Sequence, residues 1–428
     1  MKKNDSLSNW NCLMPIVTIL IVFLNQVLSV KIPDVVLIGL CVVSFFVLPI
    51  SAIYSYVAFA FLFDQWIPIY MIAFIAGIIL LLRKGFQIQK AQCYYWALGF
   101  IIIGAISIIV EELDIIIYLK DSVSLLFLLY LFINVKDEKK GSVVALWYMI
   151  GFVSMGVLSL VIVSKYMNLS DAIRLHRFGY DSLRYYLPSG VRIANENNIG
   201  RWAAIVTVLA LLQKYRELIR IEFTVFMCVF AGILALLTQS RSGIGVIVLA
   251  YILIFLFLGQ KLTVEKKFGI IFGSVVLLVI IYLLVMKYTP HLLNRFISRF
   301  DTNDLSNGRI DIFKSYHESW TSKTKWVLWG AGKQDVGDRL EVGTSCHNAI
   351  QGYLVCYGIT GTCFVFGIIS SLINEMFEPC KVKLAYITPF IVWFVAKLSG
   401  SMDTAEMLLI ISLSSLGFDY IPSDDKHG

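Results

Sequence analysis

Three short polar motifs in this sequence carry side chains that could bind and activate an anionic substrate. Arg241 lies in the stretch 238–243 (TQSRSG), where a neighbouring serine can cap the next helix and leave the arginine at its positive N-terminal end. Arg309 follows the stretch 306–308 (SNG), and His347 opens a long apolar run. Arginine at a helix N-terminus suits a diphosphate, and histidine suits general-base catalysis near neutral pH. The alternative is structural: arginines at the membrane interface, and a histidine that caps a helix or packs in the core.

Arginine is also frequent in two longer polar segments, 164–197 and 287–346, and Arg192 lies just before the stretch 195–198 (NENN). Its forked donors bind phosphate or carboxylate in pairs, whereas a solvated or headgroup-facing surface is the alternative for any single arginine. No pair of His or Cys residues has the H-x-x-x-H or C-x-x-C spacing of a zinc site, and no D-x-D motif is present. The sequence therefore predicts a reaction that needs neither a metal ion nor another cofactor.

The composition indicates which elements must position these residues. Hydrophobic residues make up 58% of the 428 residues and charged residues only 15%, with a mean hydropathy of +0.78. Apolar runs occur at 13–30, 35–49, 50–63, 67–82, 94–110, 115–134, 143–163, 198–212, 220–237, 243–258, 267–286, 347–372, 383–397 and 404–419. Because a spanning helix needs about 20 apolar residues, we predict an all-α polytopic membrane protein with about 14 (roughly 12–14) transmembrane helices and two extended extracytoplasmic loops.

Positive charge predicts how the chain is oriented in the membrane. Short loops rich in Lys and Arg are normally cytoplasmic, and the N-terminus and the loop that begins at Arg83 are of this kind. For both to be cytoplasmic, the chain must cross the membrane an even number of times between the N-terminus and Arg83. This number is even only if the run 35–63 forms two helices, with a break near Pro49. We therefore expect a multi-pass protein of the cell (cytoplasmic) membrane with both termini in the cytoplasm.

The chain then divides into five parts. These are N-terminal transmembrane helices (1–163), a first extracytoplasmic loop (164–197), central transmembrane helices (198–286), a large extracytoplasmic loop (287–346), and C-terminal transmembrane helices with a cytoplasmic tail (347–428). Lys397, Asp403 and Glu406 gather near the last exterior turn, and we interpret them as a structural ion-pair cluster.

The order of the motifs resembles that of the O-antigen polymerase and ligase superfamily of bacterial envelope biosynthesis, most strongly over 190–365. The shared order is S-R-S-G at an exterior helix boundary, G-R at the head of a helix, a G-x-G turn at 330–332, then H-N and a span that contains Gly358 and Gly361. The R-x(10)-G pattern of some polymerases is absent from both long loops.

This resemblance implies that Arg241, Arg309 and Arg192 bind the diphosphate of an undecaprenyl-linked donor, and that His347 is the base. The implied enzyme is a polysaccharide polymerase, which transfers a glycan from a polyprenyl-diphosphate donor to a sugar hydroxyl of a second lipid-linked glycan, with inversion. One alternative is an O-antigen ligase that uses a lipid A core, and another is a flippase of lipid-linked sugars.

The expected partners follow from the same resemblance. They are an undecaprenyl-diphosphate-linked oligosaccharide, membrane lipids, and a chain-length regulator and flippase of the same pathway. The net charge of +7 is explained by basic loops that orient a membrane protein, so we expect no nucleic-acid partner.

Overall fold

The computed structural model describes residues 9–85, 92–133, 141–258, 308–344, 346–376, 383–398 and 404–415, together with residues 287 and 400. Within these ranges the regular elements are all helices, which confirms the predicted all-α class. A helix covers each predicted apolar run except 267–286, which lies outside the described residues. The match follows from composition, because runs of about 20 apolar residues can satisfy their backbone in a membrane only by hydrogen bonding within the segment.

The apolar helices lie along the whole chain. They are α1 (Asn9–Gln26), α2 (Asp34–Val47), α3 (Ile50–Ala60) with its 3-10 extension η2 (Phe61–Phe63), α4 (Ile69–Lys84), α5 (Gln92–Val110), α6 (Ile115–Ile133), α7 (Gly141–Tyr166), α10 (Glu196–Tyr215), α11 (Ile221–Thr238), α12 (Arg241–Leu258), α18 (Ala349–Met376), α19 (Lys383–Lys397) and α20 (Thr404–Ser415). The polar segments between them form α8 (Leu169–Leu175), α9 (Tyr180–Leu183), α15 (Arg309–Thr321), α16 (Thr324–Trp329) and α17 (Val336–Arg339).

Among the described residues, four helices are long and apolar enough to cross a membrane by length and composition. They comprise Gln92–Val110, Val143–Tyr166, Ile221–Thr238 and Ala349–Asn374. Shorter apolar helices of 10–17 residues surround them. The chain is therefore a membrane protein, while the number of about fourteen spans stays a prediction.

The predicted break at Pro49 is confirmed. Helix α2 ends at Val47 and α3 begins at Ile50, with Pro49 in an extended conformation just before it. The Arg83 guanidinium donates hydrogen bonds to the carbonyl oxygens of Phe45 at 2.9 Å and Leu48 at 2.6 Å. A helix end leaves carbonyl groups without partners, so Arg83 compensates for the break.

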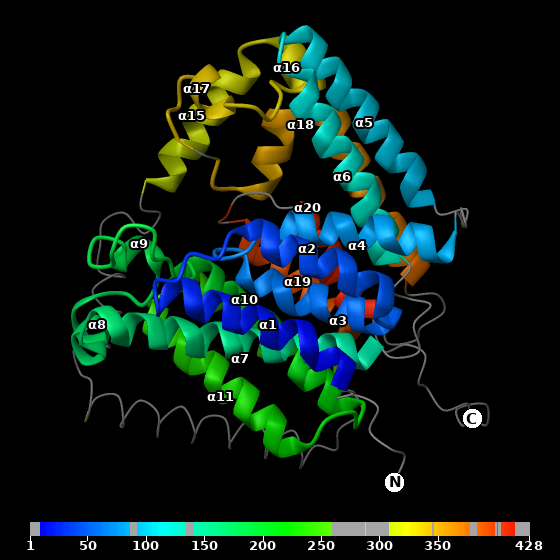
Figure 1. Cartoon of the computed structure of the whole chain (residues 1–428). Coiled ribbons are helices and arrows are strands. Elements are labelled where there is room, and N and C mark those ends of the chain that lie inside the picture. Colours follow the sequence, from blue (N-terminus) through cyan, green and yellow to red (C-terminus); the bar gives the residue numbers. More distant parts are fainter. Residues whose placement is uncertain are drawn as a thin grey trace.

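Figure 1 shows a lower bundle, which contains α1–α4, α7, α10, α11, α19 and α20, and an upper part in which α5, α6 and α18 rise toward α15–α17. A continuous apolar core fills the bundle, and residues 308–344, here called the α15–α17 subdomain, have a smaller core of their own with Tyr316 and Trp320. Lys325 pairs with Glu111 at 2.8 Å, at the end of α5. These contacts hold the subdomain above the bundle.

The G-x-G turn and the glycines of α18 prove to be parts of one joint. Gly358 has φ 67° and ψ −175°, which breaks the helical conformation inside α18. The break releases carbonyl groups upstream, and those of Val355 and Cys356 accept from the backbone of Ala331 at 2.7 Å and Gly332 at 2.9 Å. A Cβ at position 358 would lie 2.3 Å from a backbone oxygen, so this close approach requires glycine.

The predicted ion pair between Lys397 and Glu406 is present at the joint of α10, α19 and α20. The Glu406 carboxylate lies 3.0 Å from the Lys397 ammonium and 3.1 Å from the Arg201 guanidinium. The indole N–H of Trp202 also donates to this carboxylate at 2.9 Å. The third predicted member, Asp403, lies outside the described residues. The cluster ties the first turns of α10 to the α19–α20 hairpin.

Candidate functional site

The turn between α11 and α12 places Arg241 at the start of a helix. Helix α11 ends at Thr238, Gln239 adopts a left-handed conformation, and Arg241 is the first residue of α12. The Ser240 hydroxyl accepts a hydrogen bond from the backbone N–H of Gly243 at 3.2 Å and therefore acts as the predicted serine cap. The Ser242 hydroxyl lies 3.2 Å from that of Ser240. Serine on both sides of the arginine thus fixes its position at the positive end of α12.

Small residues hold α12 against α10 at this point. A Cβ on Gly243 would lie 2.7 Å from the Cα of Gly200, so the two backbones are in direct contact. This contact fixes the Ser240–Arg241 turn beside the first turn of α10, where the polar residues Glu196 and Asn198 lie.

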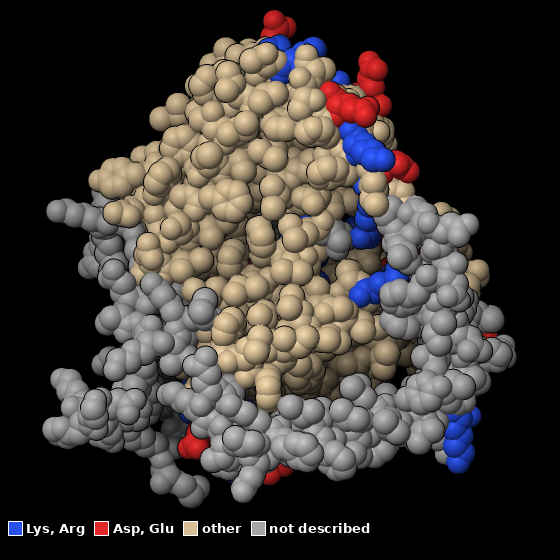
Figure 2. All heavy atoms as spheres, turned by 180° about the vertical axis from the view of Figure 1, so that it is seen from behind, with Lys and Arg blue, Asp and Glu red and all other residues tan. Residues whose placement is uncertain are grey.

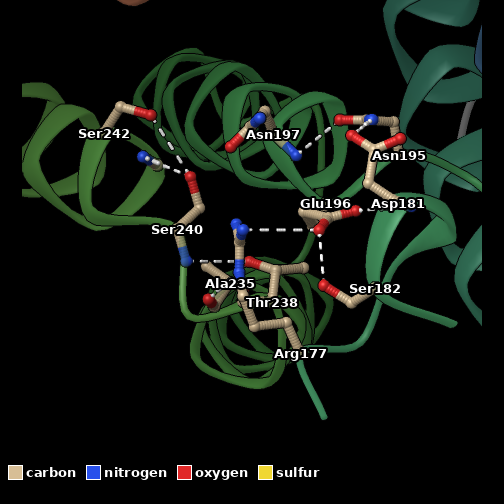
Figure 3. A network of polar contacts seen from close by, with 11 residues as sticks. Arg177, Asp181, Ser182, Asn195, Glu196, Asn197, Ala235, Thr238, Ser240 and Ser242 are labelled. Carbon is tan, nitrogen blue, oxygen red and sulfur yellow. Dashed lines mark hydrogen bonds and ion pairs between the residues drawn. The ribbon is translucent and has the colours of Figure 1, made fainter. Parts of the chain in front are cut away.

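A buried carboxylate in that first turn organises a further arginine. Glu196 is only 1% exposed, accepts from the Ser182 hydroxyl at 2.9 Å, and pairs with the Arg177 guanidinium at 3.4 Å. Arg177 also donates to the carbonyl oxygen of Thr238 at 3.0 Å. Figure 3 shows Arg177 between Glu196 on one side and the α11–α12 turn on the other. The loop 164–197 is thereby bound to the turn that bears Arg241.

Arg177, Arg241 and Arg309 lie close enough to repel one another. Burial lowers the pKa of Arg309, and the positive charges of Arg241 and then Arg177 lower it further. The pKa of Arg177 is lowered by burial and by Arg241, while Glu196 and Asp181 act in the opposite direction. Residues 177, 241 and 309 belong to three separate segments, so the fold gathers like charges that an anion would stabilise.

His347 lies two residues before α18 begins, close enough to Arg309 to be affected by its charge. Burial lowers the pKa of its imidazole below the ordinary value of 6.5, and the charge of Arg309 lowers it further. The Gln351 amide donates to the carbonyl oxygen of Phe313 at 2.7 Å, which ties the start of α18 to the first turns of α15. The Asn348 side chain accepts from the backbone N–H of Gln351 at 3.0 Å and caps α18. His347 is therefore held near Arg309, where burial and this positive charge both favour the neutral imidazole.

Three of the four residues predicted from the sequence thus come together, each at or just before the N-terminus of a helix: Arg241 (α12), Arg309 (α15) and His347 (α18). We call them, with Arg177, the Arg/His cluster. Figure 2 shows Lys and Arg atoms that run along one side of the upper part and reach into a hollow above the lower bundle. Helix N-termini and guanidinium groups both favour a bound anion.

Arg192, the fourth predicted residue, is exposed in the loop 164–197. Its backbone N–H donates to the Gln26 side chain at 2.8 Å, and its carbonyl oxygen accepts from the Trp66 indole at 2.8 Å. The sequence suggested that Arg192 would act together with Arg241 and Arg309. In the structure, the residue with described interactions with these two arginines is Arg177.

Sequence reasoning did not single out Arg177 or Glu196. Arg177 was one of several arginines of the loop 164–197, and Glu196 one letter of the NENN stretch. The residue that could have identified this pair from the sequence is Glu196 itself. A carboxylate at the start of an apolar helix is costly to bury unless a positive charge or hydrogen-bond donors lie beside it.

Within the described ranges, no group of three or more His, Cys, Asp or Glu side chains could hold a metal ion. The metal-independent reaction stays a prediction, and the groups that could bind an anion here are guanidinium groups and helix N-termini.

The substitution Glu196→Gln tests how the first loop is anchored. It removes the charge that holds Arg177 while it keeps the shape of the side chain, and we expect the unfolding free energy to fall by about 1.5–3 kcal/mol. Thermal unfolding in detergent measures the change. Glu222→Gln, at the exposed start of α11, is the matched control and should leave the unfolding temperature unchanged. Equal shifts in the two variants would contradict the anchoring role.

Comparison with known proteins gives one family. A family model described as O-antigen ligase matches residues 226–366. This range contains the α11–α12 turn with Arg241, the α15–α17 subdomain with Arg309, and the start of α18 with His347. No curated protein matches the chain. The match supports the resemblance to the O-antigen polymerase and ligase superfamily.

Proposed function

From the match of residues 226–366 to a family model described as O-antigen ligase, we propose that the chain is a glycosyltransferase that polymerises lipid-linked glycans. The observation that carries the proposal is the mutual electrostatic interaction of Arg177, Arg241 and Arg309 beside His347. This pairing of an anion site with a neutral base suits a reaction in which an anionic group leaves and a hydroxyl attacks.

The proposed reaction is a direct displacement at the anomeric carbon of a polyprenyl-diphosphate-linked glycan. His347 takes the proton of an acceptor hydroxyl, and the oxygen forms a new bond to the anomeric carbon. The bond from that carbon to the diphosphate oxygen breaks, and its electron pair stays on the leaving diphosphate. A single displacement inverts the anomeric configuration, and the products are an extended glycan and a polyprenyl diphosphate.

Arg241 and Arg309 bind the diphosphate in this proposal and stabilise the charge that grows on it as the bond breaks. Arg177 is held by Glu196 at 3.4 Å, and its charge adds to the positive field around the other two arginines. Arg192 is kept as a candidate contact to a more distant part of the donor. Fixed guanidinium groups supply the charge that a divalent ion supplies in other sugar transferases.

One experiment tests the proposal directly. The purified protein is incubated in detergent with the undecaprenyl-diphosphate oligosaccharide extracted from its host membranes, and products are separated by size. A ladder of longer glycans is expected from a polymerase. Absence of any new glycosidic bond, with or without an added acceptor, would overturn the assignment as a glycosyltransferase.

A ligase is the second candidate, because the family model that matches residues 226–366 is described as O-antigen ligase. A ligase would use the same Arg/His cluster but would transfer the glycan only when a lipid A core or another non-polyprenyl acceptor is added. The incubation described above separates the two, because a polymerase needs only the lipid-linked glycan.

A flippase of lipid-linked sugars belongs to another class of protein. It would move the intact substrate across a vesicle membrane and leave its glycosidic bonds unchanged. A histidine that favours its neutral form beside Arg309 suits the deprotonation of an attacking hydroxyl, a step that a flippase does not need, which is why the enzyme is preferred.

The pH dependence of transfer should report on His347. Because the base must be unprotonated, kcat/KM is expected to fall as the pH drops through the pKa of His347, which lies below 6.5. The substitution Arg309→Gln removes a positive neighbour, so protonation becomes easier and the acid limb should move to higher pH. The pH profile of residual activity in this variant measures the shift. An unchanged limb in Arg309→Gln would show that another group titrates.

A further inference from the structure

A polar cavity of about 200 Å³ lies where the first turns of α10 meet the α19–α20 hairpin. Its charged residues Arg201, Lys397 and Glu406 are 9%, 3% and 4% exposed, and they form the ion cluster that joins α10 to the α19–α20 hairpin. Tyr70 is 49% exposed and half-buried Asp64 lies nearby in the chain, so the cavity is open on the side of the α3–α4 connection. The three buried charged side chains therefore lie at the base of the cavity, away from this opening.

The chemistry of the lining suits a sugar. Two positive side chains, Arg201 and Lys397, are balanced by two acidic ones, Asp64 and Glu406, so the cavity has no net formal charge. A phosphate group would favour the arginine-rich cluster, whereas a neutral polyhydroxyl compound can use both the acceptors and the donors. The volume holds several waters or one monosaccharide ring.

Aromatic side chains strengthen this assignment. Phe61, Tyr70 and Trp202 line the same cavity, so apolar ring surface lies beside charged and amide groups. Sugar rings have one apolar C–H face and a rim of hydroxyl groups, which fits such a combination. The half-buried amide of Asn198 adds a donor and an acceptor to this lining.

Two short connections link the cavity to the Arg/His cluster. On α10, Glu196 binds Arg177, and Asn198 in the same first turn lines the cavity. On the α19–α20 side, the Asn348 amide donates to the carbonyl oxygen of Leu398 at 3.1 Å. Asn348 follows His347, and Leu398 follows the cavity residue Lys397. This hydrogen bond therefore connects the segment that carries the histidine to the segment that carries a cavity residue.

We infer that this cavity binds a neutral sugar residue of the acceptor glycan and so presents a neighbouring hydroxyl to His347. The inference rests on the proposed glycosyl transfer. It separates the two substrates in space: the diphosphate of the donor lies among the arginines, and the acceptor sugar lies in the charge-balanced, aromatic-lined cavity.

The test uses residues that line the cavity outside its ion cluster, because loss of Arg201, Lys397 or Glu406 would unfold the joint. The variants are Tyr70→Ala and Asn198→Leu, with Tyr185→Ala as the control, since Tyr185 is 78% exposed outside the cavity. The probe is the repeat-unit oligosaccharide freed from its diphosphate by mild acid, which can accept a glycan but cannot donate one. Its binding to the full-length protein is measured by equilibrium dialysis, and its KM as acceptor is measured with a constant donor concentration.

We expect each cavity variant to weaken binding of the free oligosaccharide and to raise its KM by about tenfold, while the KM of the lipid-linked donor changes by less than about twofold. Tyr185→Ala should change neither. Unaltered binding in both cavity variants, in protein that still transfers glycan, would overturn the acceptor site and leave the proposed function intact. Wild-type protein that binds the oligosaccharide in the cavity but forms no bond would instead remove the proposed function.

Discussion

Replacement of His347 by alanine is expected to lower the rate of glycosyl transfer by about 10²–10⁴-fold, the usual contribution of a general base. The imidazole is held half-buried before α18, and the charge of Arg309 favours its neutral form. The rate of ladder formation with saturating lipid-linked glycan measures the loss.

A matched control distinguishes catalysis from folding. His317 lies on α15 with its side chain exposed and its ring parallel to that of Phe313. His317→Ala should retain the wild-type rate of transfer. The His317→Ala and His347→Ala proteins should both insert in the membrane and, after purification in detergent, give the same elution profile as the wild type. A ladder of normal rate and length from His347→Ala would remove the histidine from the mechanism. A His347→Gln variant with full activity would show that a hydrogen bond suffices and that no proton is taken up.

The apolar pattern predicted most of the helices because each one satisfies its backbone within its own segment. The break at Pro49 was predictable for the same local reason, since proline cannot continue a helix from the preceding turn. The break at Gly358 was not, because it depends on residues 330–332, which approach α18 from a distant part of the sequence. A glycine inside an apolar run can mark either close packing or a helix break, and only the tertiary contact distinguishes them.

The candidate site was predictable where the chemistry is local. A serine next to Arg241 and a glycine before Arg309 both mark the start of a helix, and both arginines lie at helix N-termini. Arg177 was not distinguishable from its neighbours, because its importance depends on Glu196, which lies on another element. The cavity to which we assign the acceptor sugar could not be predicted for the same reason, since its residues come from η2, α4, α10, α19, α20 and the α3–α4 connection.

The second large effect concerns the arginines. Arg241→Ala and Arg309→Ala should each lower the transfer rate by about 10²–10³-fold, the typical loss when one stabilising donor is removed from a developing anion. Because the two groups act on one diphosphate in the proposed reaction, the double variant should lose less than the product of the single losses. Arg241→Lys keeps the charge but loses the paired donors, so it should recover only part of the rate. Arg184→Ala, an exposed arginine of the loop 164–197, serves as control and should be fully active.

Substitution of Arg309 should lower the activity without lowering the stability of the protein. Burial and the charges of Arg241 and Arg177 all disfavour the charged form of Arg309, so its removal relieves repulsion in the protein without substrate. We therefore expect Arg309→Gln to unfold at the wild-type temperature or above it. Inorganic pyrophosphate should raise the unfolding temperature of the wild type and of Arg184→Ala, and it should do so much less in Arg309→Gln, because a ligand stabilises only the state that binds it. A variant that is both inactive and less stable would assign Arg309 to the support of the fold, since an anion site held together against repulsion gains stability when one of its charges is removed.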